Sequence, residues 1–442
     1  MTAPRPDLAG FTIDVFQNEF LPAGGRNVNA IVTVTSGLHS ATLASPAAAA
    51  AAEVIIVDCS GSMNDPAGKM AEAKAATAAA IDAIRDGVSF AVIAGNEKAR
   101  PVYPADASLA LASPQTREAA RQAVRGLQAD GGTAIGQWLL LAHQIFTSGG
   151  RDGDGPAPVR HAILLTDGKN QHETPEKLAG AISWCEGTYR CDCRGVGTDW
   201  EVAELRKVST ALLGTVDIVA DPAGLAADFT ALMRAAMSKE ISDVSLRVWT
   251  PQHARIKYLK QVAPAVDDLT GRRAAVGAQS GDYPAGAWGP GESRDYHLCV
   301  EVSPAGVGQE MLAARVSLVA GAGAGAEVLG QGLVRALWTD DEALSTRINP
   351  HVAHYTGQAE LAEVIQDGLQ ARKEGDEDTA TAKLGRAVSL ASEAGHEETA
   401  RLLAKVVEVV DATGTVRLKK RIADADEMAL DSRSTKTVRT KK

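Results

Sequence analysis

The sequence predicts an α/β domain with a mostly parallel sheet, which is inserted into a flanking β-sandwich and followed by a C-terminal helical segment. Three observations support this prediction. Between residues 53 and 239, short apolar runs alternate with amphipathic stretches of about a dozen residues, a pattern typical of parallel sheets. Residues 11–40 and 241–340 instead alternate with a period of two, as sandwich strands do. Residues 350–430 return to a helical period, and a basic tail follows at 431–442.

The composition narrows the possible partners and the cellular location. The chain has 442 residues and a formal net charge of -10, which argues against a nucleic-acid partner and against an anionic membrane surface. The start of the sequence lacks the basic and apolar order of a secretory signal, and no apolar run is rich enough in large side chains to span a bilayer. We therefore expect a cytoplasmic protein. Abundant Ala and Arg with few aromatic residues are typical of a bacterium with a GC-rich genome.

The central α/β domain is expected to run from residue 53 to residue 239. Its apolar, β-branched runs predict buried strands at 54–57, 88–95, 159–166, 189–196 and 216–220, and a short edge strand at 100–103. Helices are predicted between them at 69–85, 113–127, 134–147, 175–184, 200–213 and 222–237.

The two flanks of this domain are expected to share one β-sandwich. An alternating hairpin occupies Phe11–Phe20 and Val28–Ser36, and an isolated hairpin has no core of its own. Beyond Ile241, further alternating runs are separated by clusters of Gly and Pro such as Gly281–Gly291. The hairpin is the natural missing piece of that sheet pair, so we infer that the α/β domain interrupts the sandwich.

The last part of the chain predicts about three helices and then a solvated tail. Apolar residues recur at helical spacing around Leu361, Leu384 and Leu402, and we expect these helices to pack on the sandwich. The tail from Asp431 to Lys442 carries five basic residues and no acid after Asp431. Its hydroxyls would be accessible to a kinase if the tail were mobile: Ser434, Thr435, Thr437 and Thr440.

Three oxygen side chains follow the first buried strand of the α/β domain. Asp58, Ser60 and Ser62 stand at alternate positions, and Gly61 lets the backbone turn between them. In open α/β sheets, ligands bind beyond the carboxyl ends of the strands, which is where this loop lies. Hydroxyl and carboxylate oxygens suit a hard cation such as Mg²⁺.

This loop resembles the Asp-x-Ser-x-Ser signature of the von Willebrand factor A (VWA) domain, whose metal-ion-dependent adhesion site (MIDAS) begins with that signature. The segment 131–136 is similar to the family's threonine loop, and 164–168 is similar to its strand that ends in aspartate. The resemblance implies a Rossmann-like fold with a MIDAS. It also implies that one Mg²⁺ or Mn²⁺ is surrounded by five residues: Asp58, Ser60, Ser62, Thr133 and Asp167.

The resemblance also implies a function in binding. In the family, an acidic residue of a partner protein completes the cation's coordination, so this chain is expected to be a metal-dependent protein-binding scaffold. By resemblance, it is also expected to belong to a bacterial signalling assembly. Its partner there would be a Ser/Thr kinase, a phosphatase or a phosphothreonine-binding protein. The alternative is an Mg²⁺-dependent hydrolase or phosphotransferase, which the metal chemistry permits. Against that alternative, the sequence has neither a P-loop nor a Gly-x-Ser-x-Gly elbow around Ser60 or Ser62. We therefore expect no enzymatic activity.

The cysteines are not expected to form a metal site. Cys185, Cys191 and Cys193 cluster in sequence, which would allow zinc, but no fourth ligand is spaced to complete a tetrahedron. Buried free thiols in a reducing compartment are the simpler interpretation. Cys59 stands between two site residues, at a position whose side chain is expected to point away from the cation.

Overall fold

The computed structural model describes residues 10–37, 51–65, 67–148, 159–321, 323–411 and 413–439. The chain divides into two compact units. One contains residues 46–240 and 423–432, and the other contains residues 1–45, 241–422 and 433–442. Each unit is described separately below.

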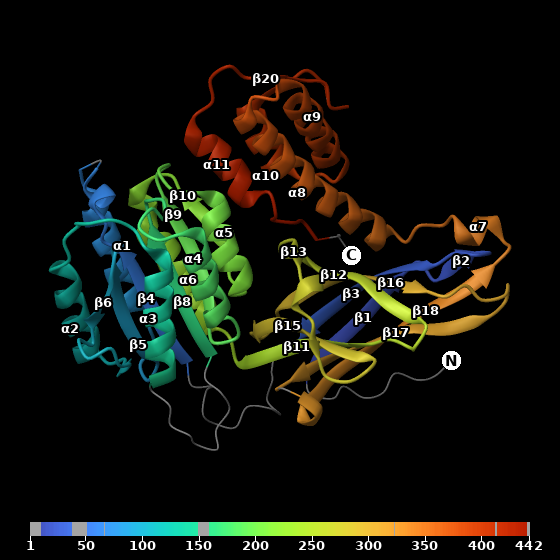
Figure 1. Cartoon of the computed structure of the whole chain (residues 1–442), viewed down its shortest axis with the longest axis horizontal. Helices are drawn as coiled ribbons and strands as arrows, with labels where there is room; N and C mark the ends of the chain where they lie inside the picture. The colour runs from blue at the N-terminus through green and yellow to red at the C-terminus, as the bar shows by residue number, and fades with distance from the viewer. Residues whose placement is uncertain are drawn as a thin grey trace. The chain divides into compact units, whose positions relative to one another are not determined.

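The first unit is the α/β domain, built on a sheet of seven strands (Figure 1). Its path is β10-β9-β8-β4-β5-β6, with β7 also paired to β5, and the five strands from β10 to β5 are parallel. The short strands β6 and β7 run antiparallel to β5. The strands are β4 (Ala51–Asp58), β5 (Ser89–Gly95), β6 (Ala99–Tyr103), β7 (Ala110–Leu111), β8 (Val159–Thr166), β9 (Arg190–Val196) and β10 (Val216–Val219).

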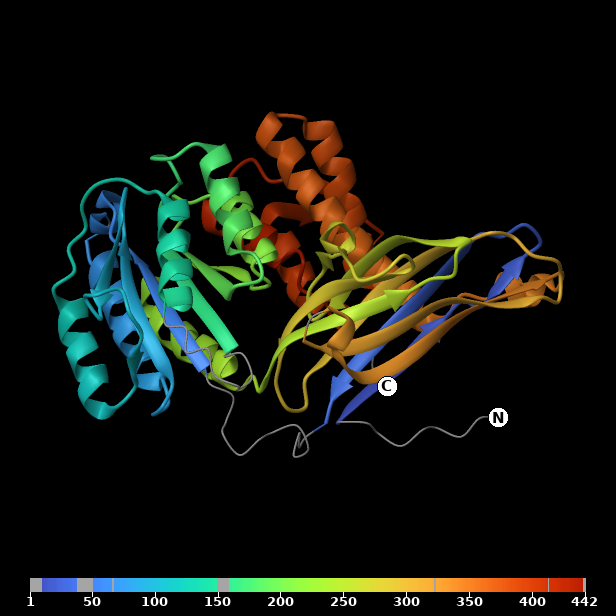
Figure 2. The same ribbon diagram turned by 60° about the horizontal axis from the view of Figure 1, so that its bottom comes forward.

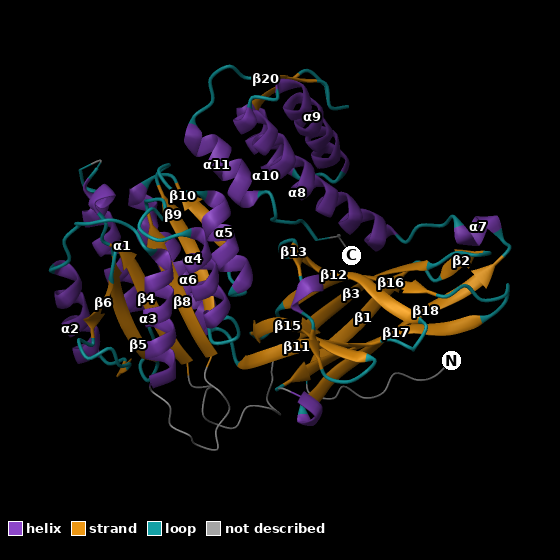
Figure 3. Ribbon diagram, viewed as in Figure 1, coloured by secondary structure: helices purple, strands orange, loops and turns teal. Residues whose placement is uncertain are grey.

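Helices cover this sheet because its central strands are apolar on both faces. One core joins Ile55, Phe90 and Ile163 of the strands to Met70 of α1 and Phe229 of α6. Figure 3 shows the helices as purple ribbons around the orange strands. The helices are α1 (Lys69–Ala83), α2 (Pro114–Arg125), α3 (Ile135–Ser148), α4 (Pro175–Cys185), α5 (Val202–Ala211), α6 (Leu225–Met237) and α11 (Asp424–Arg433).

Helix α11 is the unexpected member of this unit. Its residues 424–432 come from the far end of the chain, yet they group with the α/β domain. The Arg206 guanidinium of α5 donates to the backbone oxygen of Asp431 at 2.6 Å and to its carboxylate at 2.8 Å. This helix follows the three helices expected around Leu361, Leu384 and Leu402, and the sequence did not predict it.

The second unit contains the β-sandwich, whose two sheets are visible in Figure 2. One sheet has the order β1-β3-β16-β12-β13 and the other β14-β15-β11-β17-β18-β2. The N-terminal strands β1 (Phe11–Gln17) and β3 (Asn27–Ser36) extend the sheet of β16, and β2 (Phe20–Pro22) pairs with β18. The other strands are β11 (Ile241–Trp249), β12 (Ala254–Ala263), β13 (Asp267–Asp268), β14 (Ala274–Ala275), β15 (Ser280–Trp288), β16 (Ser293–Val302), β17 (Glu310–Ala320) and β18 (Glu327–Thr339).

The sandwich core contains residues from both sides of the insertion. Val32 of β3 and Leu298 of β16 are buried together with Leu246 of β11 and Val316 of β17. This confirms an α/β domain inserted in a β-sandwich. One expected detail is wrong, because the stretch Gly281–Gly291 is largely a strand, β15, rather than a separator between strands.

Helices follow the sandwich in the same unit. They are α7 (Glu342–Ser345), α8 (Pro350–Glu374), α9 (Glu377–Glu393) and α10 (Glu397–Val406), and a small hairpin of β19 (Val407–Val409) and β20 (Val416–Leu418) comes after them. Helix α8 packs on the sandwich through Val352 and Tyr355, which join Ile31 and Val262 in a second apolar cluster.

The expected solvated tail is wrong for residues 434–439, which lie against the second unit. The backbone of Val266 donates to Thr435 at 2.8 Å, and Arg439 donates to the buried carboxylate of Asp295 at 3.0 Å. The Ser434 side chain is also held, since that residue is only 4% exposed. Thr440, Lys441 and Lys442 lie outside the described residues.

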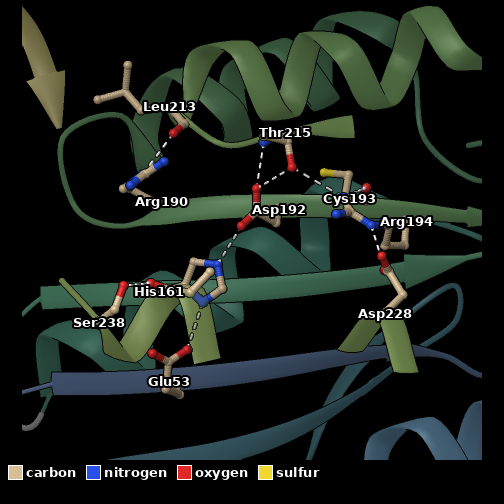
Figure 4. A network of polar contacts seen from close by, with 11 residues as sticks. Glu53, His161, Arg190, Asp192, Cys193, Arg194, Leu213, Thr215, Asp228 and Ser238 are labelled. Carbon is tan, nitrogen blue, oxygen red and sulfur yellow. Dashed lines mark hydrogen bonds and ion pairs between the residues drawn. The ribbon is translucent and has the colours of Figure 1, made fainter. Parts of the chain in front are cut away.

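A buried charged network joins three parallel strands of the α/β domain near their amino ends (Figure 4). His161 of β8 lies between Glu53 of β4, 2.7 Å from Nδ1, and Asp192 of β9, 2.9 Å from Nε2. The other Asp192 oxygen accepts from the backbone and hydroxyl of Thr215, both at 2.6 Å. The two carboxylates outweigh the burial of the ring and raise the pKa of His161 to about 9. The ring of His161 is therefore cationic at neutral pH.

The sandwich core generates the first prediction. Leu298 is fully buried in the central strand β16, so Leu298→Ala should lower the free energy of unfolding of the second unit by about 2–5 kcal/mol. Denaturant unfolding followed by hydrogen exchange of the β16 peptides measures this loss. The matched control is Leu333→Ala in β18, where the residue is 40% exposed and the change should stay within about 0.5 kcal/mol. Equal losses in the two variants would contradict the assigned core.

The His161 network generates a pH prediction. The folded chain holds a proton up to about pH 9 that an ordinary histidine releases near pH 6.5. The stabilisation is therefore complete below about pH 6.5 and is lost as pH rises towards 9, with a slope of up to about 1.4 kcal/mol per pH unit. Burial also raises the pKa of Glu53, which acts in the same direction.

Denaturant midpoints of the α/β domain between pH 6 and 9.5 check this dependence. The His161→Gln variant should be less stable at low pH and have a flatter profile, whereas the control His143→Gln, on α3, should keep the decline. A flat profile for the unaltered protein would show that His161 is neutral in the fold.

Candidate metal centre

Three loops of the α/β domain meet at the carboxyl edge of its parallel sheet. Strands β4 and β8 are neighbours, so the loops that follow Asp58 and Thr166 leave the sheet at the same edge. The third loop, residues 129–134, precedes α3. Backbone hydrogen bonds join it to the first loop, because Gly61 donates to Gly131 at 2.9 Å and Asp130 donates to Cys59 at 2.8 Å.

The Asp58 carboxylate ties two of these loops together. One of its oxygens accepts from the backbone N–H of Ser60 at 2.7 Å, and the other accepts from the hydroxyl of Thr166 at 2.5 Å. Asp58 is fully buried, and burial raises its pKa to about 6 although both hydrogen bonds act to lower it. Its role in this geometry is to fix the backbone that carries Ser60.

Asp167 holds the second serine. The Ser62 hydroxyl donates to Asp167 Oδ1 at 2.7 Å and lies 3.0 Å from the Ser60 hydroxyl. The other Asp167 oxygen accepts from the Lys69 ammonium at 2.5 Å. In Asp58 and in Asp167, both carboxylate oxygens therefore accept hydrogen bonds from groups of the protein itself.

Thr133 is positioned by the backbone and ring of His172. The N–H of His172 donates to the carbonyl of Thr133 at 2.9 Å, and the Thr133 N–H donates to the ring Nδ1 at 3.2 Å. The ring lies so close to Gly132 that a Cβ there would be 2.0 Å from it, so only glycine fits.

The three hydroxyls converge in front of Gly168. A Cβ at that position would lie 3.1 Å from Thr133 Oγ1, 3.2 Å from Ser62 Oγ and 3.9 Å from Ser60 Oγ. The missing side chain thus leaves a space that three neutral oxygens face. This donor set, backed by two carboxylates, fits a divalent cation that takes oxygen ligands. The structure brings together all five residues that the sequence singled out.

This space opens into a cavity of about 190 Å³. Besides the hydroxyl residues and glycines, its lining includes the side chains of Lys169, Gln171, His172 and Asp199. Lys169 is half exposed and pairs with Glu201 at 2.7 Å. The rim therefore presents one cationic side chain, one anionic side chain and hydrogen-bonding groups to whatever enters.

The sequence reasoning missed three residues of this site. Thr166 and Lys69 contact the carboxylates directly, and the ring of His172 accepts from the backbone of Thr133. The available signals were a polar residue at the end of an apolar strand and a lysine at the first position of α1, although neither is specific alone.

No cysteine lines this cavity, although Cys59 belongs to the first of the three loops. All five are free and buried, and burial raises the pKa of the Cys59 thiol to about 12. Cys185 donates to the backbone oxygen of Leu139 at 3.4 Å. Over the described ranges, no group of three or more His, Cys, Asp or Glu side chains is arranged to hold a metal ion. Serine and threonine are not among these four residue types, so this absence says nothing about the site formed by the Ser60, Ser62 and Thr133 hydroxyls.

Comparisons with known proteins agree with this geometry. Residues 52–218 match the von Willebrand factor type A domain, and residues 389–434 match the von Willebrand factor type A C-terminal domain. The solved structure of a von Willebrand factor type A protein from Catenulispora acidiphila is 53% identical, with a TM-score of 0.91 and 98% of each chain covered. The ArnB paralogue VWA2 from Sulfolobus acidocaldarius shares the fold at 13% identity, with a TM-score of 0.57 and coverage of 97% of this chain and 98% of that one.

Curated relatives match smaller parts of the chain. An uncharacterised protein of Synechocystis is 26% identical over 223 residues, which are 49% of each protein. The human inter-alpha-trypsin inhibitor heavy chain H4 is 31% identical over 163 residues, or 35% of this chain and 17% of that protein. The chain thus spans about half or less of the length of these relatives. The two domain matches, together with the full-length similarity to the Catenulispora structure, show that the chain belongs to the von Willebrand factor type A family.

Proposed function

We propose that the carboxyl edge of the sheet binds one Mg²⁺ or Mn²⁺ ion as a MIDAS. The observation that supports this most directly is the convergence of the Ser60, Ser62 and Thr133 hydroxyls on the space in front of Gly168. These three residues would hold the cation. Asp58 and Asp167 would orient them and supply negative charge nearby.

We propose further that the loaded site binds a protein partner through an acidic side chain. Neutral hydroxyl ligands leave most of the cation's charge uncompensated, so a carboxylate from outside is the natural further ligand. In the cavity beside the site Lys169 is already paired with Glu201 and Asp199 is anionic, so the attraction for a carboxylate would come from the cation itself. The protein would then act as a metal-dependent binding scaffold rather than as an enzyme.

We place this scaffold in the bacterial cytoplasm, in a signalling assembly. Five free, buried thiols suit a reducing compartment. Within the part of the chain that the structure describes, no helix has the length and apolar character needed to cross a membrane. A Ser/Thr kinase or phosphatase, or a phosphothreonine-binding protein, stays a predicted partner, but the buried Ser434 does not support modification of the docked tail.

The alternative function is an Mg²⁺-dependent hydrolase or phosphotransferase. The site hydroxyls contact each other and Asp167, and the ring nitrogen of His172 that faces the site accepts from the Thr133 backbone rather than from a serine. The base next to Ser62 is the Asp167 carboxylate, which already accepts from Lys69, rather than a histidine. Turnover of nucleotides or phosphoesters that requires Mg²⁺ and stops with EDTA would favour the alternative.

Removal of one hydroxyl tests the metal site. Ser60→Ala should weaken Mn²⁺ binding by about tenfold or more and abolish the rise in melting temperature that Mn²⁺ causes, because one of three hydroxyl ligands is lost. Asp58→Ala should lose the same stabilisation. Isothermal titration calorimetry and thermal melts of the full chain measure both effects.

The matched control is Ser148→Ala at the end of α3, where the hydroxyl donates to the carbonyl of Ile145. That variant should bind Mn²⁺ as the unaltered chain does. Undiminished affinity in Ser60→Ala and Asp58→Ala would show that the cation, if bound, lies elsewhere. A pull-down with and without EDTA then identifies the partner.

A further inference from the structure

The Lys69 ammonium lies inside the candidate metal centre. Its Nζ atom is 2.5 Å from Asp167 Oδ2, and the side chains of the pair are 2% and 0% exposed. The same atom lies 3.4 Å from the backbone oxygen of Ser62 and 3.9 Å from the exposed carboxylate of Asp199. A cation of the protein itself is thus buried against the serine loop.

This contact changes the charge of the site. Asp58 and Asp167 supply two negative charges, and Lys69 cancels one of them. With a divalent ion bound, the buried groups would carry one net positive charge instead of none. Lys169 has no comparable effect because it is half exposed and already paired with Glu201.

We propose that Lys69 makes binding of the cation depend on binding of a carboxylate. This inference rests on the proposed metal site. The ammonium repels the divalent ion, so the ion alone binds weakly. The same positive charge attracts a carboxylate to the loaded site, so the two ligands bind cooperatively, and Lys69 is a specificity-determining residue for an acidic partner.

The repulsion between the Lys69 ammonium and the divalent ion is strong because Lys69 and Asp167 are buried. Charges that are out of water are screened far less than surface charges, and Lys69 is too enclosed to move into solvent without giving up Asp167. A lysine that served only to pair with Asp167 would stabilise the fold. It would not affect cation and carboxylate binding in opposite directions.

The test uses variants of the full chain that separate the charge of Lys69 from its hydrogen bond to Asp167. Lys69→Gln keeps a donor for Asp167 but removes the charge, and Lys69→Arg keeps the charge. Lys74→Gln, on the same helix but bonded to the carbonyl of Arg125, is the matched control. Calorimetry measures Mn²⁺ affinity with and without acetate as the carboxylate probe.

We expect Lys69→Gln to bind Mn²⁺ about tenfold or more tightly, because a buried positive charge is gone. Acetate should tighten Mn²⁺ binding in the unaltered chain and clearly less in this variant. Lys69→Arg and Lys74→Gln should behave as the unaltered chain does. Folding of Lys69→Gln only with Mn²⁺ present would support the same conclusion, since the ion would then replace the lost charge.

Two results would overturn the inference while leaving the metal site intact. One is Mn²⁺ binding to Lys69→Gln that is no tighter than to the unaltered chain. The other is a Lys69→Gln variant that stays unfolded with Mn²⁺, which would make Lys69 a structural residue only. Failure of every variant and of the unaltered chain to bind Mn²⁺ would instead reject the proposed function, and the inference with it.

Discussion

The hydrogen bonds of the Asp58 carboxylate are the constraint on which the rest of the site depends. One oxygen fixes the Ser60 backbone and the other fixes Thr166 on the neighbouring strand. Because parallel strands end at the same edge, this single buried group holds two loops that are more than 100 residues apart in the sequence. Ser62 and Asp167 repeat the connection at 2.7 Å, so the serine hydroxyls are oriented before any ligand arrives.

Much of this arrangement could be predicted because it depends on short sequence patterns. Asp58, Ser60 and Ser62 follow an apolar run that can only be a buried strand, and the carboxyl ends of such strands carry the ligand sites of α/β sheets. Thr133 and Asp167 came from the resemblance to the family rather than from geometry. The sandwich could be predicted because the N-terminal hairpin has an alternating apolar face but no core of its own, so it must pack on another part of the chain.

The rest depended on pairings that no local pattern reveals. Strand β15 contains Gly and Pro, which normally interrupt strands, but Tyr283 and Trp288 bury enough apolar surface to hold it in the sheet. The tail has the composition of a disordered segment, yet Asp295 gives Arg439 a buried partner. Lys69 is the clearest case, because a lysine at the start of a helix is ordinarily a solvated residue and only the fold places Asp167 beside it.

The two ends of the parallel sheet show how the same kinds of group can serve stability or binding. Near the amino ends, His161 lies between Glu53 and Asp192, and each of its ring nitrogens is within hydrogen-bond distance of a carboxyl group. At the carboxyl edge the carboxylates are also paired, but the hydroxyls of Ser60, Ser62 and Thr133 border a cavity. A buried network whose groups bond to one another rigidifies the strands, whereas hydroxyls that border an open space can take a ligand. This difference explains why the His161 network is a structural element and why the site proposed for the cation lies at the other edge of the sheet.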